Sequence, residues 1–252
     1  MDLRVWQLAG NTAQLRLEGL SASLDLEQPA RGIHDIHPAL DTAADFHILG
    51  IEVPAISKSG RDALVESYTR SIDLVAAYRE TKEWPIQVDV RWQAVGNAGA
   101  TGLLGAIDMV VSVRTDLLDS RPGLAIVSAV PPGEMLRLRD RQSGRFEPLE
   151  ADGTIDVVPH DGPGCLLFRP VLGDLSYVEM IHPADFDRDE IVRGERSDAP
   201  ISVRHRLFPQ PLEKGVILRA RVRGAILARS TDQELASALY GALSTADPPL
   251  GT

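Results

Sequence analysis

Apolar residues occur along the chain in short segments that alternate with polar residues and end at Gly, Pro, Asp or Asn. Alternation with a period of two is typical of half-buried β-strands, and this punctuation is typical of the turns between them. The pattern predicts strands at residues 4–8, 14–17, 22–26, 46–53, 86–95, 107–114, 124–130, 135–139, 155–158, 165–171, 175–181, 201–208 and 215–223, with 225–228 continuing the last one. Residues 34–47, 96–105 and 185–200 are predicted to be irregular or loops, and 140–153 a surface hairpin or loop.

Residues 63–79 fit two patterns. Leu64, Tyr68, Ile72 and Val75 lie at helical spacing, whereas residues 64–70 and 73–79 also match two strands of a meander. The clean alternation of the next segment, IQVDVRWQAV at 86–95, favours the two strands.

One segment, at about residues 231–244, is predicted to be a helix. Thr231 and Glu234 have the spacing of a capping box. Its predicted apolar stripe is Leu235, Ala238, Leu239 and Leu243. At least twelve strands, with no internal repeat and no linker, predict one all-β domain over residues 1–252. The expected fold is a large two-sheet antiparallel β-sandwich with one C-terminal helix.

Composition narrows the classes of function. The 252-residue chain has a net charge of −10, which argues against generic binding to nucleic acid or anionic membranes. The single cysteine, Cys165, excludes an internal disulfide framework and a thiolate zinc cluster. The N-terminus lacks a basic stretch followed by an apolar run, and no segment approaches the ~20 apolar residues of a membrane span. We therefore expect a cytoplasmic protein.

The segment GVILRARVR at 215–223 carries three arginines on one strand face. Its alternation places Arg219, Arg221 and Arg223 opposite an apolar face. On the neighbouring predicted strand at 201–208, Arg204 and Arg206 share one face and His205 lies on the other. Pairing of the two strands would gather five guanidiniums. Such a surface is either solvated and paired with acidic residues or a groove for a carboxylate, phosphate, sulfate or, more weakly, vicinal hydroxyls.

A second candidate is YVEMIHPAD at 177–185. Alternation places Tyr177 and Glu179 on one face and His182 on the other, at the strand end before Pro183. A carboxylate and an imidazole can supply general acid–base chemistry. They would cooperate only if the strand twists or bulges there, and the alternative is a structural histidine bonded to the loop.

Three histidines and three aspartates lie within residues 34–47: His34, Asp35, His37, Asp41, Asp45 and His47. Their spacing matches no metal template, and no regular element is predicted to present them together. The glycine run Gly96, Gly99 and Gly102 lacks the context of a phosphate-binding loop. We predict neither a metal nor a cofactor.

Several segments together resemble the galactose mutarotase-like superfamily, whose fold is a β-supersandwich. They are LRLEGLSASLDLEQPARGIHDI, DLVAAYRETKEWPIQVDVRW, GVILRARVRGAIL and the closing helix with DPPLGT. The resemblance covers pattern and strand order over most of the chain, and the nearest relatives expected are uncharacterised bacterial proteins of planctomycete type. It implies a large two-sheet antiparallel sandwich whose concave face holds a carbohydrate.

Aldose mutarotases use a glutamate base and a histidine acid on that face. The histidine-bearing motifs of the family are not found here, and residue type alone makes His160, His182, His205, Glu179 and Glu213 the candidates. In polysaccharide lyases the same sandwich is an accessory, non-catalytic domain, so the fold alone does not give an activity.

The resulting hypothesis is a carbohydrate-binding protein, with an acidic sugar as one candidate ligand. Its substrate-binding residues are predicted to be Arg204, Arg219, Arg221 and Tyr177. As an enzyme it would be a mutarotase-like epimerase, with Glu179 or Glu213 as base and His182 or His205 as acid. The alternative is a structural or protein–protein interaction module without a small ligand. The oligomeric state stays open.

Overall fold

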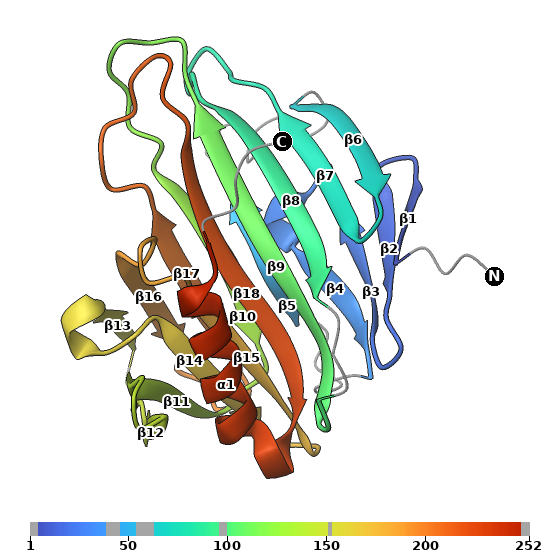
Figure 1. Cartoon of the computed structure of the whole chain (residues 1–252), viewed down its shortest axis with the longest axis vertical. Coiled ribbons are helices and arrows are strands. Elements are labelled where there is room, and N and C mark those ends of the chain that lie inside the picture. The colour runs from blue at the N-terminus through green and yellow to red at the C-terminus, as the bar shows by residue number, and fades with distance from the viewer. Residues whose placement is uncertain (1–4, 39–45, 54–62, 96–99, 151–152, 248–252) are drawn as a thin grey trace.

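The computed structural model describes residues 5–38, 46–53, 63–95, 100–150 and 153–247. Within these ranges, eighteen strands form two nine-stranded sheets that face each other (Figure 1). The pairing is antiparallel throughout both sheets. The predicted two-sheet antiparallel sandwich with one C-terminal helix is confirmed.

The first sheet, called sheet I, contains much of the N-terminal part of the chain and three later strands. In spatial order its strands are β1 (Trp6–Ala9), β2 (Thr12–Arg16), β3 (Ser21–Asp25), β4 (Ile33–His37), β5 (His47–Glu52), β10 (Leu124–Val130), β17 (Ile201–Leu207), β16 (Arg188–Arg193) and β13 (Thr154–Val157). A short 3₁₀ turn, η1 (Pro29–Arg31), precedes β4.

The second sheet, called sheet II, carries the candidate site. In spatial order its strands are β12 (Arg145–Pro148), β11 (Gly133–Asp140), β14 (Cys165–Pro170), β15 (Leu175–Ile181), β18 (Leu218–Ala228), β9 (Leu103–Arg114), β8 (Gln87–Val95), β7 (Asp73–Tyr78) and β6 (Leu64–Arg70). Two further 3₁₀ turns are η4 (Pro159–Asp161) and η5 (Arg229–Thr231).

The main core lies between the two sheets. In β8, Val88, Val90 and Trp92 are buried and alternate with the half-buried Asp89 and Arg91. Burying a large apolar side chain stabilises the fold by roughly 1.5–3 kcal/mol, and a one-residue slip would turn all of these side chains outward. The hydrophobic pattern therefore fixes which residues of each strand face the core and which face outward.

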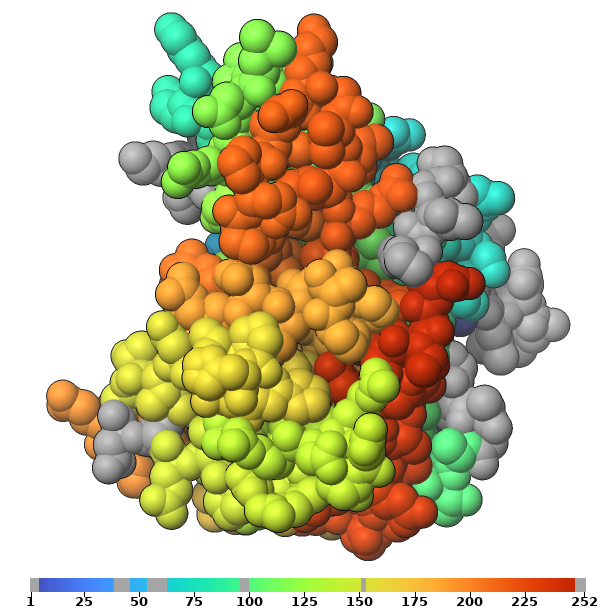
Figure 2. Space-filling model, turned by 60° about the vertical axis from the view of Figure 1, so that its left-hand side comes forward, coloured from blue at the N-terminus to red at the C-terminus, as the bar shows by residue number. Residues whose placement is uncertain are grey.

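Helix α1 (Asp232–Thr245) covers part of the outer face of sheet II and closes a second apolar cluster. Figure 2 shows the helix, in red, beside the yellow-green residues of β11 and β12. Its buried apolar residues are Ala236, Tyr240 and Leu243, whereas Leu235 and Leu239 are half-buried. The predicted stripe is wrong at Ala238, which is exposed.

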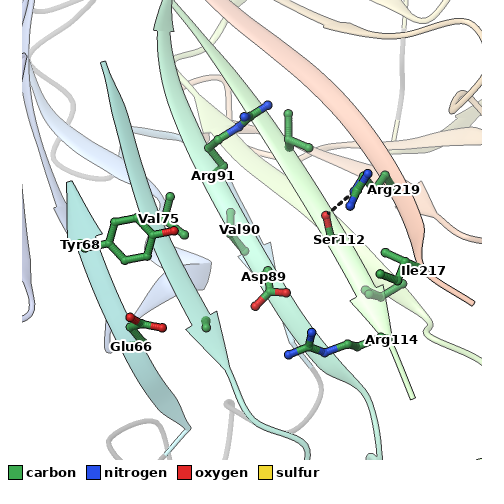
Figure 3. A pocket seen from close by; sticks show the side chains of 13 residues that line it. Glu66, Tyr68, Val75, Asp89, Val90, Arg91, Ser112, Arg114, Ile217 and Arg219 are labelled. Atoms are coloured by element: carbon green, nitrogen blue, oxygen red, sulfur yellow. Dashed lines mark hydrogen bonds between the residues drawn. The ribbon is translucent and has the colours of Figure 1, made fainter. Parts of the chain in front are cut away.

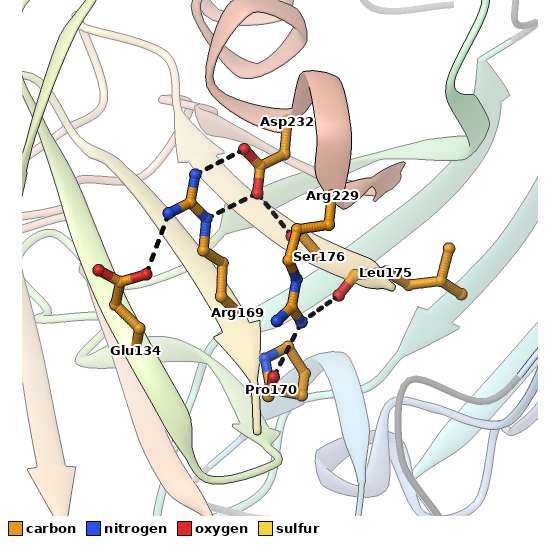
Figure 4. Close-up of polar contacts among 7 residues, drawn as sticks. All are labelled: Glu134, Arg169, Pro170, Leu175, Ser176, Arg229 and Asp232. Carbon is orange, nitrogen blue, oxygen red and sulfur yellow. Dashed lines mark hydrogen bonds and ion pairs between the residues drawn. The ribbon is translucent and has the colours of Figure 1, made fainter. Parts of the chain in front are cut away.

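The start of α1 is held by a carboxylate, although not through the predicted capping box. Thr231 makes no capping hydrogen bond with its side chain. Asp232 instead accepts hydrogen bonds from Arg169 Nε at 2.8 Å and Nη2 at 2.9 Å, and from Ser176 Oγ at 2.6 Å (Figure 4). These contacts tie the helix to β14 and β15 and lower the pKa of Asp232 despite its burial.

Two strands lie where loops were predicted. β4 falls in the segment predicted to be irregular because Asp35, at φ 51°, interrupts its alternation between Ile33 and Ile36. β16 falls in the predicted charged loop because its inward positions include Asp189, a charged residue, besides Ile191. An inward-facing carboxylate hides the apolar alternation that normally marks a strand.

The predicted pairing of the two arginine strands is wrong. β17 lies in sheet I between β10 and β16, whereas β18 lies in sheet II between β15 and β9. Arg204 and Arg206 are therefore on a different sheet from Arg219, Arg221 and Arg223. The loop at 208–217 does not return within one sheet but crosses from sheet I to sheet II.

Candidate functional site

A groove of about 290 Å³ lies on the outer face of sheet II, over β6, β7, β8, β9 and β18. Its polar lining includes carboxylates, guanidiniums and an aromatic hydroxyl: Glu66, Tyr68, Asp89, Arg91, Arg114 and Arg219 (Figure 3). Its volume is near the lower end of the range for small-molecule sites, ≈300–1,000 Å³.

The strand register aligns five of these six residues in two rows across the sheet, whereas Arg114 pairs with Gln87. One row runs Glu66, Ala77, Asp89, Ser112 and Arg219. The next row runs Tyr68, Val75, Arg91, Val110 and Arg221. Directly opposed residues on antiparallel strands have Cβ atoms roughly 4.5–5.5 Å apart, so each row is a continuous line of neighbouring side chains. In both rows, charged or aromatic residues on β6, β8 and β18 alternate with the smaller residues of β7 and β9.

The three arginines of β18 have different surroundings. Arg219 is half-buried, lines the groove and donates from Nε to Ser112 Oγ at 3.2 Å. Arg223 is 8% exposed and makes a two-point ion pair with Asp108, at 2.5 and 2.9 Å. The predicted arginine face therefore faces a groove at Arg219 and is covered further along the strand.

Arg221 is the covered residue between these two. It is 8% exposed, and its Nη2 lies 3.4 and 3.3 Å from the carbonyl oxygens of Leu243 and Ala246 at the end of α1. A guanidinium there satisfies free carbonyls and complements the helix dipole. Burial lowers the pKa of Arg221, and the nearby Asp108 opposes this shift.

A second polar cluster lies in the core between the sheets. His205 Nε2 of β17 is 3.1 Å from Glu179 Oε1 of β15, and His205 Nδ1 is 2.6 Å from Asp189 Oδ1 of β16. Ser128 Oγ donates to Glu179 at 3.0 Å. The side chains of Glu179, Asp189 and His205 are 0% exposed, so this cluster is an ionic link between the two sheets that solvent does not reach.

Electrostatics keep this histidine protonated. Burial alone would lower the pKa of His205, but the facing carboxylates of Asp189 and Glu179 raise it to about 10. Burial raises the pKa of Asp189, and the charge of His205 acts in the opposite direction. The buried charge of His205 is paired with both carboxylates and hydrogen-bonded through Nδ1, whereas its Nε2 forms an ion pair with Glu179 without a hydrogen bond.

Two other residues predicted for the site, His182 and Glu213, lie apart from this cluster, whereas Tyr177 lies beside Glu179 and Ser128. His182 is half-buried, and its Nδ1 accepts a hydrogen bond from the Ala184 N–H at 3.2 Å. Glu213 is exposed in the loop before β18. Tyr177 is fully buried and stacks on Phe168, with ring centroids 6.1 Å apart. The structure therefore brings Glu179 and His205 together but leaves His182 and Glu213 away from them.

Two further residues lie on other surfaces. Arg204 pairs with Glu52 and Glu190 on the outer face of sheet I. His160 is exposed at a second hollow of about 510 Å³, which Arg139, Arg141 and Tyr240 also line.

Four charged groove residues were not predicted: Glu66, Asp89, Arg91 and Arg114. The signal for Glu66, Asp89 and Arg91 was present in the alternation of 64–70 and 86–95, because the polar positions of these two segments share one face of the meander. Most aromatic side chains lie in the core, and Trp6, Trp84 and Trp92 are all buried. Tyr68, at 44% exposed, is the exception that reaches the groove.

No group of three or more potential metal ligands is found in the part of the chain that the structure describes. His34 is 7% exposed and its Nδ1 contacts the Gly32 carbonyl at 3.0 Å, while Asp41 and Asp45 lie outside the described residues. The helix in the described ranges does not combine the length and apolarity that crossing a membrane requires.

No family model and no curated protein matches the sequence. Among solved structures, a candidate aldose 1-epimerase from Escherichia coli K12 is similar over 85% of this chain and 98% of its own, with a TM-score of 0.55 and 9% identity. The GalM/aldose epimerase homologue from C. elegans is similar over 84% of this chain and 96% of its own, with a TM-score of 0.50 and 10% identity.

A third similar structure belongs to a larger protein. The GH36 α-galactosidase AgaB from Geobacillus stearothermophilus is similar over 88% of this chain but only 41% of its own, with a TM-score of 0.52 and 9% identity. Structural similarity at sequence identities this low establishes the fold and leaves the activity open. The chain has the galactose mutarotase-like fold, the β-supersandwich that its strand pattern resembles.

Proposed function

We propose that this protein binds a carbohydrate in the groove on the outer face of sheet II. The observation that carries the proposal is the lining of the groove, where the exposed ring of Tyr68 lies among carboxylates and guanidiniums. A sugar offers an apolar C–H face that packs on an aromatic ring, and hydroxyls that both donate and accept hydrogen bonds. Glu66 and Asp89 accept from hydroxyls, and the arginines donate to them.

The groove also favours an acidic sugar. Its polar sides are not equivalent, since Glu66 lies on the edge strand β6 whereas Arg114 and Arg219 lie on β9 and β18. A guanidinium binds a carboxylate through two parallel hydrogen bonds and has no acceptor of its own. We assign the hydroxyl-bearing part of the ligand to the β6 side and its acidic group to the β9–β18 side.

Epimerase turnover is the finer part of this proposal. It needs an acid and a base that reach the sugar, and Glu66 and Asp89 are the carboxylates that line the groove. The catalytic roles predicted for Glu179, His182, His205 and Glu213 remain predictions. Two of those residues, Glu179 and His205, are enclosed in the core.

The test is calorimetric titration with galacturonate, glucuronate and the matching neutral hexoses, together with a mutarotation assay. R219A and Y68A should weaken binding of an acidic sugar. Loss of a charge-assisted hydrogen bond is worth roughly 1.5–3 kcal/mol, or about 10- to 100-fold in Kd. R204A is the matched control because Arg204 lies on the outer face of sheet I. Unchanged binding in R219A and Y68A, or an equal loss in R204A, would refute this site.

The second candidate is an interaction module without a small ligand. Exposed apolar side chains support it: Ile217, which lines the groove, is 52% exposed, and Leu118, in the loop after β9, is 83% exposed. Their two loops are joined by backbone hydrogen bonds between Ser120 and Leu212, at 3.0 and 2.9 Å. This function predicts that none of the sugars binds saturably.

A further inference from the structure

The free edge of β6 is the longest strand edge that the described part of the fold leaves open. Each sheet ends in two edge strands, β1 and β13 in sheet I and β12 and β6 in sheet II. β1, β12 and β13 have four residues each, and β12 ends at Pro148. Short edge strands and prolines prevent pairing with another chain. β6 has seven residues, LVESYTR, with neither device, and forms the margin of its sheet (Figure 1).

Hairpin geometry decides which backbone groups of β6 face outward. Arg70 pairs with Asp73 across the two-residue turn at 71–72, and such a flanking pair exchanges its hydrogen bonds within the hairpin. Hydrogen-bonded and non-hydrogen-bonded positions alternate along an antiparallel pair. The N–H and C=O groups of Tyr68 therefore face β7, and those of Ser67 and Thr69 face the free edge.

We infer that this edge pairs with the β6 edge of a second copy of the chain, antiparallel about a two-fold axis at Tyr68. In this register Tyr68 faces Tyr68 of the second copy, Ser67 faces Thr69, and Glu66 faces Arg70. The last two pairs occur twice by symmetry. An aromatic pair, hydroxyl pairs and opposite charges are the cross-strand combinations that stabilise sheets. The Ser67–Thr69 pairs also exchange four backbone hydrogen bonds.

Neighbouring registers lack this complementarity. With the axis at Ser67, Glu66 would face Tyr68 and Thr69 would face Val65, so neither charge is matched. With the axis at Thr69, Arg70 would face Tyr68 and Ser67 would face Ser71. The charge pattern of β6 therefore selects one register, as charged pairs do elsewhere in sheets.

Pairing at β6 would extend the groove. Glu66 and Tyr68 line it at the β6 margin, so the two-fold axis places the grooves of the two copies side by side on one continuous sheet face. Tyr68 and Arg70 of the second copy then border the groove of the first. Such an arrangement fits an extended ligand better than one sugar ring. The dimer itself does not depend on the proposed sugar binding, because main-chain and side-chain pairing alone hold it.

A cysteine scan tests the register directly. In this register only position 68 faces itself, at a non-hydrogen-bonded pair whose Cα separation of ≈4.5 Å suits a disulfide. The native Cys165 is buried and gives no background. Oxidised Y68C should run as a covalent dimer on a denaturing gel. V65C is the control, because Val65 is more exposed than Tyr68 but lies roughly 20 Å from its own counterpart at ~3.4 Å per residue.

Charge exchange tests the pairing without covalent trapping. Light scattering should give the wild type twice the 27.3 kDa mass of the chain. E66R and R70E should each be monomeric, because each sets like charges opposite each other. An equimolar mixture of the two variants should restore the dimer as a heterodimer. A monomeric wild type at high micromolar concentration, dimers that persist in both variants, or equal crosslinking of Y68C and V65C would overturn the inference.

Discussion

The buried ionic link of Glu179, His205 and Asp189 joins the two sheets, and the substitution His205→Ala tests its contribution to stability most directly. His205 contributes the positive charge that faces both carboxylates, and all three side chains are 0% exposed. Removing one partner of a buried ion pair destabilises a protein by about 3–5 kcal/mol, because the remaining charge is left uncompensated. Domains have free energies of unfolding of roughly 5–15 kcal/mol, so H205A should lose a large fraction of that stability.

Urea unfolding followed by fluorescence of the three buried tryptophans measures this loss. R204A is the control, since Arg204 is the neighbouring residue on β17 but faces outward, and it should lose less than about 1 kcal/mol. Replacing the whole link in H205L/E179M/D189L should recover most of the stability, because apolar residues of similar volume often replace a buried ion pair without loss. A loss below about 1 kcal/mol in H205A, or a triple variant no more stable than H205A, would refute the reasoning.

Two further predictions follow from paired charges. The pKa of His205 is raised from 6.5 to about 10, so the contribution of His205 to stability is complete below pH 6.5 and is lost as the pH rises through about 10. The urea midpoint of the wild type should therefore fall over this interval. The midpoint of the H205L/E179M/D189L variant should fall less. D108A leaves the buried Arg223 without its partner and should cost about 3–5 kcal/mol by thermal unfolding. D198A, which breaks an exposed pair with Arg196, should leave thermal unfolding nearly unchanged, and equal losses in the two variants would contradict the assignment.

Much of the fold could be predicted because each strand of a sandwich buries one face. The predicted strands at 64–70, 124–130 and 175–181 match β6, β10 and β15 as the structure has them. The helix predicted at about 231–244 is α1, one residue shifted at each end. Local alternation carries this information, since a side chain on the wrong face would expose apolar surface. The misses, β4 and β16, are strands whose inward positions are irregular or charged.

The groove was harder to predict because its residues come together through strand order. Arg219 lies beside Ser112, 107 residues away in sequence, and Arg223 meets Asp108, 115 residues away. No local pattern specifies that β18 inserts between β15 and β9. The arginine face of β18 was therefore predicted correctly as a face, but its environment depended on this insertion and on the end of α1, which covers Arg221.

The buried link between Glu179 and His205 could have been predicted from the alternation of their strands. Alternation places Glu179 with Tyr177 on one strand face, and His205 opposite Arg204 and Arg206, on the apolar side of its strand. Two ionisable residues predicted to face the core of one sandwich each need a partner there, because an unpaired buried charge is strongly destabilising. Opposite charge then favours pairing them with each other, across the sheets rather than along either strand. The same inference moves Glu179 and His205 away from a solvent-exposed sugar site and toward a structural role in joining the two sheets.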